Sequence, residues 1–153
     1  MRVQAVACPV RGDTLQLTNN PWTIRPGLIG ASLGVDAHVL INDFAAIGHA
    51  VAQLTEEHFA HICGPGAPLR ESGTITIVGP GTGLGVAAVL RDHGRHHVIA
   101  TEGGHLDFAP IDAIDDAILA LLRQRHGRVS LERVVSGPGL SAIHEVLAAI
   151  EGS

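Results

Sequence analysis

Two polar residues that can do chemistry, Asn42 and Asp43, follow directly on the apolar segment 37–41 (AHVLI). This segment is typical of a buried strand, and ligands of open α/β sheets bind outside the carboxyl ends of the strands. A carboxylate there can accept the proton of a substrate hydroxyl, while the neighbouring amide orients that hydroxyl. Capping of the following helix is the commoner role of such an aspartate, and the two roles are compatible.

Glycines dominate the segment 79–85 (GPGTGLG), which separates the β-branched segment 74–78 (TITIV) from the apolar segment 86–90 (VAAVL). Because no Lys-Ser/Thr pair follows and no helix begins there, it is neither a P-loop nor a Rossmann turn. A glycine turn between two strands can present consecutive N–H groups to an anion, and Thr82 adds a hydroxyl. An ordinary hairpin turn is the alternative, although four glycines in seven residues exceed what a turn requires.

A carboxylate and an imidazole flank two glycines in Glu102-Gly103-Gly104-His105. The glycines allow both side chains to converge on one small ligand, and their acceptors and donor suit sugar hydroxyls. Metal binding with the nearby Asp107 is a weaker interpretation, because zinc sites need further ligands. A solvated loop is the third interpretation. Glu132, in a short helical turn, would by itself be a surface charge.

Alternating strands and helices must position these residues, which indicates an α/β fold. The glycine- and proline-rich segment 63–73 (CGPGAPLRESG) is the expected boundary between two lobes. Asp43 is expected at or near the N-cap of helix 44–54. The expected strands are 2–8, 14–18, 37–41, 74–78, 86–90 and 96–101, and the other expected helices are 27–34, 112–126, a short one from Ser130 and a final one from Pro138.

Composition excludes several classes of protein. The 153 residues are 46% hydrophobic and only 16% charged, with a net charge of −5, which argues against disorder. All ten basic residues are dispersed arginines, so no basic stripe indicates nucleic-acid binding. No membrane span or signal-peptide pattern is apparent, and Cys8 and Cys63 stand alone in the sequence. We therefore expect a cytoplasmic protein.

Four segments follow one another in the order LINDFAAIGHAV (40–51), GPGTGLGVA (79–87), EGGHLDFAP (102–110) and LERVVSGPGL (131–140). Together they resemble bacterial glucokinases, which belong to the hexokinase and actin-like ATPase fold group. The opening segments AVACPVRGD (5–13) and LTNNPW (17–22) resemble the same family.

The resemblance implies an incomplete ribonuclease H-like α/β fold with two lobes around a cleft. Residues 1–62 would be the remainder of the small N-terminal lobe, 63–73 a linker or loop, and 74–153 the first part of the large lobe. It also implies ATP-dependent phosphorylation of glucose to glucose 6-phosphate, with Mg²⁺ bound to the nucleotide, and it favours a homodimer. Neither nucleic acid nor a membrane is expected as a partner.

The resemblance further assigns roles to the residues singled out above. Asp43 would be the catalytic base for the sugar's 6-hydroxyl, and the turn Gly81-Thr82-Gly83 would bind phosphate. Related sugar kinases carry a structural zinc after the Gly-His pair, but His105 is followed here by LDFAP without cysteine, so no zinc is expected. The remaining glucose hydroxyls would be bound by Asn42, Glu102, His105 and Glu132.

Family members begin with an Asp-x-Gly-Gly-Thr phosphate loop and end with an adenosine-binding segment, and neither is found in these 153 residues. The sequence therefore predicts a truncated glucokinase with weak or no activity of its own. Two alternatives remain at this point: a non-catalytic sugar-binding or regulatory module, and a truncated gene product without an independent role.

Overall fold

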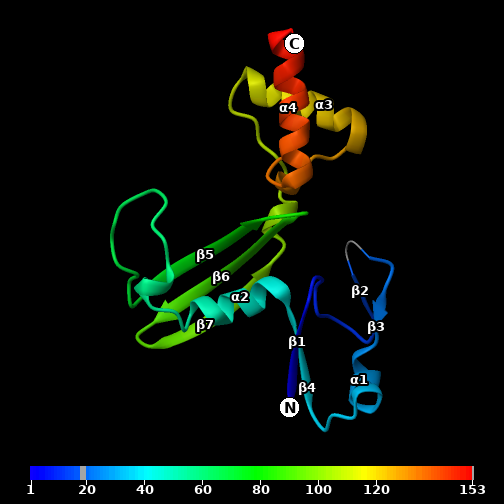
Figure 1. The fold of residues 1–153 in the computed structure, drawn as a ribbon, viewed down its shortest axis with the longest axis vertical. Coiled ribbons are helices and arrows are strands. Elements are labelled where there is room, and N and C mark those ends of the chain that lie inside the picture. The colour runs from blue at the N-terminus through cyan, green and yellow to red at the C-terminus, as the bar shows by residue number, and fades with distance from the viewer. Residues whose placement is uncertain (18–19, 153) are drawn as a thin grey trace. The chain divides into compact units, whose positions relative to one another are not determined.

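The computed structural model describes residues 1–17 and 20–152. Thr18 and Asn19, which end the predicted strand 14–18 and belong to the motif LTNNPW, lie outside the described residues, as does Ser153. Figure 1 shows the chain as a ribbon with its helices and strands labelled. Within the described ranges, no helix combines the length and hydrophobicity that crossing a membrane requires.

The chain forms two compact units. The first unit comprises Met1–Ile75 and Ala88–Ala100, and the second comprises Thr76–Ala87 and Thr101–Ser153. The expected lobe boundary at 63–73 stays a prediction.

A parallel pair of strands, β1 (Arg2–Val6) and β4 (His38–Asn42), forms the centre of the first unit. Its register runs from Arg2 opposite His38 to Val6 opposite Asn42, so Asn42 is the last residue of its strand, one residue beyond the predicted end at Ile41. Between the two strands the chain forms a short antiparallel pair and a helix. These elements are β2 (Leu15–Gln16), β3 (Thr23–Ile24) and α1 (Pro26–Leu33).

Local residue chemistry explains where α1 begins and ends. Pro26 stands in the first turn, where its missing N–H costs no helical hydrogen bond. Gly34 ends the helix at φ 59°, a left-handed conformation that glycine adopts without a Cβ penalty. Both ends agree with the predicted helix 27–34 to within one residue.

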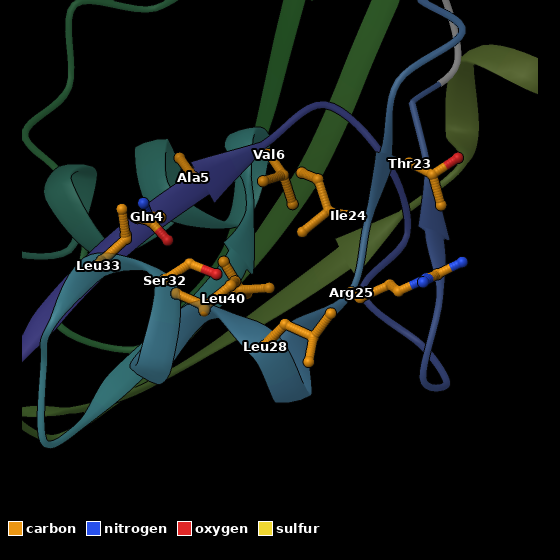
Figure 2. A pocket seen from close by; sticks show the side chains of 11 residues that line it. Gln4, Ala5, Val6, Thr23, Ile24, Arg25, Leu28, Ser32, Leu33 and Leu40 are labelled. Carbon is orange, nitrogen blue, oxygen red and sulfur yellow. The ribbon is translucent and has the colours of Figure 1, made fainter.

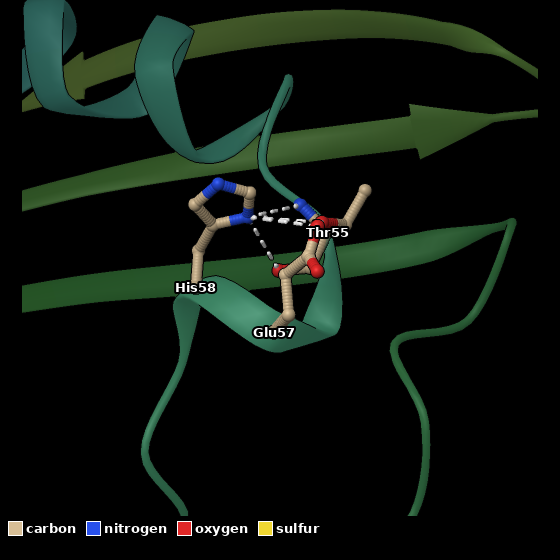
Figure 3. Close-up of polar contacts among 3 residues, drawn as sticks. All are labelled: Thr55, Glu57 and His58. Atoms are coloured by element: carbon tan, nitrogen blue, oxygen red, sulfur yellow. Dashed lines mark hydrogen bonds and ion pairs between the residues drawn. The ribbon is translucent and has the colours of Figure 1, made fainter.

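The helix α2 (Asp43–Val51) follows β4 without a loop and packs against the sheet of the first unit. Gly48 also brings the helix close to Val98 of the segment 95–101, since a Cβ built on this glycine would lie 2.6 Å from Val98 Cγ1. After α2, the chain turns once more in η1 (Glu56–His58), a 3₁₀ helix capped by Thr55, whose Oγ1 donates a hydrogen bond to Glu57 Oε1 at 2.8 Å (Figure 3).

A three-stranded sheet in the order β5-β6-β7 follows, made of β5 (Gly73–Pro80), β6 (Leu84–Asp92) and β7 (Arg95–Thr101). Connections this short join antiparallel strands, because a parallel pair needs a crossover. The turn between β6 and β7 is His93-Gly94, with φ values of 45° and 81°, the positive pair that a tight hairpin requires.

Two helices, α3 (Ala113–His126) and α4 (Gly137–Glu151), pack together in the second unit. Asp112 caps α3 and Ser136 caps α4, each accepting a hydrogen bond from the backbone N–H three residues on. The predicted helices 112–126 and from Pro138 are confirmed within one residue, and the predicted short helix after Ser130 is η3 (Leu131–Arg133). The core contains Ile118, Leu119, Leu122, Val129, Val134, Ala142 and Val146.

Candidate functional site

The junction of β4 and α2 positions Asn42 and Asp43. The N-cap of α2 is Asn42, whose Oδ1 accepts a hydrogen bond from Ala45 N at 3.1 Å. Asp43 is therefore the first residue of the helix and not its cap, and its Oδ1 accepts from Phe44 N at 2.9 Å. This arrangement leaves Asp43 Oδ2 and the Asn42 amide N–H groups without a hydrogen bond among the described residues, so both can meet a substrate hydroxyl.

The glycine turn between β5 and β6 contains fewer residues than the predicted turn 79–85. The strands extend to Pro80 and from Leu84, so only Gly81, Thr82 and Gly83 form the turn. Gly81 N donates to Gly83 O at 2.8 Å within the turn, and Gly81 O accepts from Gly137 N at 2.8 Å. Gly81 N–H is thus occupied, and the groups left to meet an anion are the N–H groups of Thr82 and Gly83 and the Thr82 hydroxyl.

Glu132 lies beside this turn. Its Oε2 accepts a hydrogen bond from Leu84 N at 3.0 Å, and a Cβ on Gly83 would lie 2.3 Å from the same oxygen. Glu132 is half-buried, unlike the surface charge that its position alone indicated. The carboxylate is held by one oxygen, and its second oxygen has no hydrogen bond within the described residues.

Glu102 and His105 lie at the two ends of the second glycine segment. Gly103–His105 forms the 3₁₀ helix η2, and this turn brings His105 Nε2 to 3.6 Å from Glu102 Oε2. The His105 side chain remains 46% exposed and the Glu102 side chain 56% exposed, so a ligand can reach both. The turn thus brings the two side chains together, and their convergence on one ligand stays a prediction.

Leu84 connects these pieces of the second unit. Gly104 is packed against its carbonyl so closely that a Cβ on the glycine would lie 2.1 Å from Leu84 O. The Leu84 N–H donates to Glu132 Oε2. Leu131 N donates to Leu106 O at 2.8 Å, which joins η3 to the end of η2. The second unit therefore gathers the glycine turn, η2 and η3, whereas Asn42 and Asp43 belong to the first unit.

Two supporting residues were not predicted. Thr101 Oγ1 donates to Val86 O at 2.9 Å and accepts from Gly103 N at 3.3 Å, which fixes the start of η2. Arg128 donates to His105 O and to Asp107 Oδ1, both at 2.7 Å, and so engages the carboxylate that the sequence offered as a metal ligand. A threonine directly before a Glu-Gly-Gly-His segment was the only sequence signal for either residue.

A pocket of about 240 Å³ in the second unit is lined by Thr82 and Glu132 together. Arg133, His126 and Arg125 also line it, and Arg133 brings a positive charge that has no ion pair within the described residues. Arg125 forms an ion pair with Glu145, and this hydrogen bond and charge raise the pKa of the guanidinium and lower the pKa of the carboxyl. Among the residues that the structure describes, no three His, Cys, Asp or Glu side chains gather in a way that holds a metal ion.

A larger hollow of about 780 Å³ lies in the first unit, beside β1 and α1 (Figure 2). Its wall is mainly apolar, with Leu28, Leu33 and Leu40 among the lining residues. Because neither Asn42 nor Asp43 lines it, this hollow does not support the chemistry predicted from the sequence.

The strands and helices described above define an α/β protein, whose second unit holds Glu102, His105, Glu132 and the glycine turn. The chain belongs to the glucokinase family, whose family model matches residues 1–153. It is 60% identical to a glucokinase of Zymomonas mobilis over 148 residues and 38% identical to one of Hahella chejuensis. These alignments cover 97% of this chain and 46% and 45% of the two relatives, so the chain spans about half their length.

Solved structures give the same result. A glucokinase from an Antarctic psychrotroph matches at 34% identity with a TM-score of 0.75, covering 98% of this chain and 46% of that one. The glucokinase of Balamuthia mandrillaris in complex with glucose matches at 20% identity with a TM-score of 0.77, covering 98% and 47%, and is informative about the fold alone. The α/β kinase fold is therefore shared with glucokinases.

Proposed function

We propose that this chain carries the sugar-binding and proton-accepting residues for ATP-dependent phosphorylation of glucose. The observation that carries the proposal is the contact of Glu132 with Leu84, next to the glycine turn. The family model matches all 153 residues of the chain that holds this contact. This contact holds a candidate sugar ligand against a candidate phosphate-binding turn, the two kinds of group that a sugar kinase must place side by side.

Each residue has one role in the proposal. Asp43 accepts the proton of the 6-hydroxyl as the hydroxyl oxygen bonds to the terminal phosphorus of ATP and ADP leaves. The other sugar hydroxyls are bound by Asn42, Glu102, His105 and Glu132. Such a site rejects analogues that lack a hydroxyl, because its own polar groups are then left unpaired.

The phosphates would meet the N–H groups of Thr82 and Gly83 and the Thr82 hydroxyl, with Arg133 contributing charge from the shared pocket. Mg²⁺, when bound with the nucleotide, neutralises charge on the phosphate oxygens. No residue here is proposed to hold zinc. A ribonuclease H-like arrangement of two lobes around a cleft, a homodimer and a cytoplasmic location complete the proposal, in keeping with the family.

A non-catalytic sugar-binding fragment is the second candidate, and the observation that favours it is the share of the relatives that the chain spans, 46% of the Zymomonas mobilis glucokinase. Calorimetry on the 153-residue chain with glucose and then with ATP distinguishes the two candidates. Binding of both ligands supports the kinase, whereas binding of glucose alone supports the fragment. Absence of glucose binding would overturn both.

The role of Asp43 can be tested in a hybrid in which this chain replaces the matching segment of the Zymomonas mobilis glucokinase, 60% identical over 148 residues. Asp43→Ala should lower turnover in a coupled assay by about 10²–10⁴-fold, the contribution of a positioned general base, while glucose still binds. Asp36→Ala, which removes an exposed aspartate from the same unit, is the matched control and should leave turnover unchanged. Full turnover of the Asp43→Ala hybrid would refute the assignment.

A further inference from the structure

A second hollow of the first unit is lined by two arginines, Arg70 and Arg91, and has no part in the chemistry above. Its volume is about 370 Å³, at the lower end of the ~300–1,000 Å³ typical of small-molecule sites. Ser72 and Thr74 add two hydroxyl groups to its lining, and Leu69 and Ile75 add apolar surface.

Neither guanidinium has a partner in the described part of the chain. The ion pairs of arginines there involve only Arg125 and Arg128, and no side-chain hydrogen bond engages Arg70 or Arg91. Arg91 is half-buried on β6, so part of its side chain has left water without gaining a carboxylate. An unpaired cation in such a place is stabilised by an anion.

The acidic residues next to the two arginines do not neutralise the hollow. Glu71 and Asp92 are each adjacent in sequence to one arginine, but neither lines the hollow. Asp92 Oδ1 instead contacts His93 Nδ1 at 2.6 Å. The lining therefore carries two positive charges and no negative one.

The loop that supplies Arg70 is tied to its surroundings on both sides of that residue. Leu69 N donates a hydrogen bond to Glu56 Oε1 at 3.2 Å, and Ser72 Oγ contacts His93 Nδ1 at 3.4 Å. These contacts keep the loop close to the end of β6, where Arg91 lies. The hollow is thus built from this loop and from β6.

We propose that this hollow binds a small phosphomonoester. Two guanidinium groups match the charge of a phosphate dianion and can donate paired hydrogen bonds to its oxygens, with hydroxyls available for a third. A carboxylate carries a single charge and needs only one guanidinium. The volume suits a ligand of a few carbon atoms. The site is independent of the proposed glucose phosphorylation.

The test uses ¹H–¹⁵N spectra of the full 153-residue chain titrated with glycerol 3-phosphate. We expect saturable shifts of the amide signals of residues 69–75 and Arg91. Arg91→Gln and Arg70→Gln should each weaken binding by about tenfold or more, as loss of hydrogen bonds to a charged ligand does. Arg70→Gln lies in a loop, so it keeps the test valid if Arg91→Gln disturbs folding. The control Arg95→Gln removes an exposed arginine that does not line the hollow, and it should bind as the unaltered chain does.

Glycerol, and sodium chloride at matched ionic strength, should cause no saturable shift of these signals. Tighter binding of the dicarboxylate malonate than of glycerol 3-phosphate would overturn the phosphomonoester assignment. Shifts confined to residues 81–83, or equal weakening by Arg91→Gln and Arg95→Gln, would overturn the site itself.

Discussion

Glu132 Oε2 accepts the backbone hydrogen bond of Leu84 at 3.0 Å, across 48 positions of the sequence. The carboxylate thereby has two roles. One oxygen accepts from the first N–H of β6 after the glycine turn, and the other oxygen remains available to a ligand. Because Gly83 leaves no space between itself and Glu132, the position of the side chain depends directly on the turn.

The two roles of Glu132 can be separated by substitution. Glu132→Gln keeps an acceptor for Leu84 N, so its free energy of unfolding should stay within about 1 kcal/mol of the unaltered chain, while glucose binding weakens through loss of the charged acceptor. Glu132→Ala leaves the buried Leu84 N–H unpaired, so it should lower the free energy of unfolding by about 1–3 kcal/mol in addition to weakening glucose binding. Urea denaturation and glucose calorimetry measure the two effects. Equal stability of the two variants would show that the hydrogen bond to Leu84 does not contribute to the free energy of unfolding.

Two neighbouring glycines should respond differently to substitution by alanine. At Gly104 the new Cβ would meet a backbone carbonyl at 2.1 Å, which cannot move aside, so we expect destabilisation by about 2 kcal/mol or more. At Gly83 it would meet the flexible end of Glu132 at 2.3 Å, so the fold should persist while glucose affinity falls. Gly66→Ala, with no atom within 4 Å, is the control. A lower Tm for Gly83→Ala than for Gly104→Ala would contradict this explanation.

Local signals in the sequence predicted most helices and strands, because capping residues, prolines and glycines act on their own neighbourhood. The end of α1 at Gly34 and the start of α4 after Ser136 are examples. The strand β3 was not predicted, since two residues carry no periodicity and their pairing depends on β2. Asn42 and Asp43 are equally good caps by residue type, and only the backbone geometry makes Asn42 the cap.

The candidate site was less accessible to sequence reasoning. The spacing of Glu102 and His105 was sufficient to predict their approach, because two glycines separate them. Glu132 by itself indicated a surface charge, and only the family resemblance assigned it to the sugar. Its contact with Leu84 is long-range in sequence, and no pattern of residue types encodes such a pairing.

The contact between α2 and β7 gives a stability prediction for the first unit. Gly48→Ala gains about 1 kcal/mol of helix propensity, but its Cβ would lie 2.6 Å from Val98 Cγ1, and overpacking costs about 1–3 kcal/mol. We expect net destabilisation in urea denaturation. Gly27→Ala in α1 meets no atom within 4 Å and should instead stabilise by about 0.4–1 kcal/mol. A stabilised Gly48→Ala variant would mean that α2 does not pack this closely.

The ion pair of Arg125 and Glu145 predicts a dependence of stability on pH. The guanidinium lowers the pKa of Glu145 by hydrogen bonding and by charge, below its ordinary value of about 4.5. A carboxyl whose pKa is lower in the folded state stabilises that state above its ordinary pKa, and this contribution is lost as the pH falls through the folded value. Both side chains are exposed, so the effect should be small and should shrink in salt.

Thermal unfolding of the unaltered chain and of Glu145→Gln, compared at pH 6 and at pH 3, measures this contribution. The unaltered chain should have the higher Tm at pH 6, and the difference should narrow on acidification, because protonation of Glu145 abolishes its charge. Glu71→Gln removes an exposed carboxylate that has no ion pair among the described residues, so its Tm should track the unaltered chain at both values. A difference that widens on acidification would reverse the sign expected from the lowered pKa and would exclude the ion pair as its source.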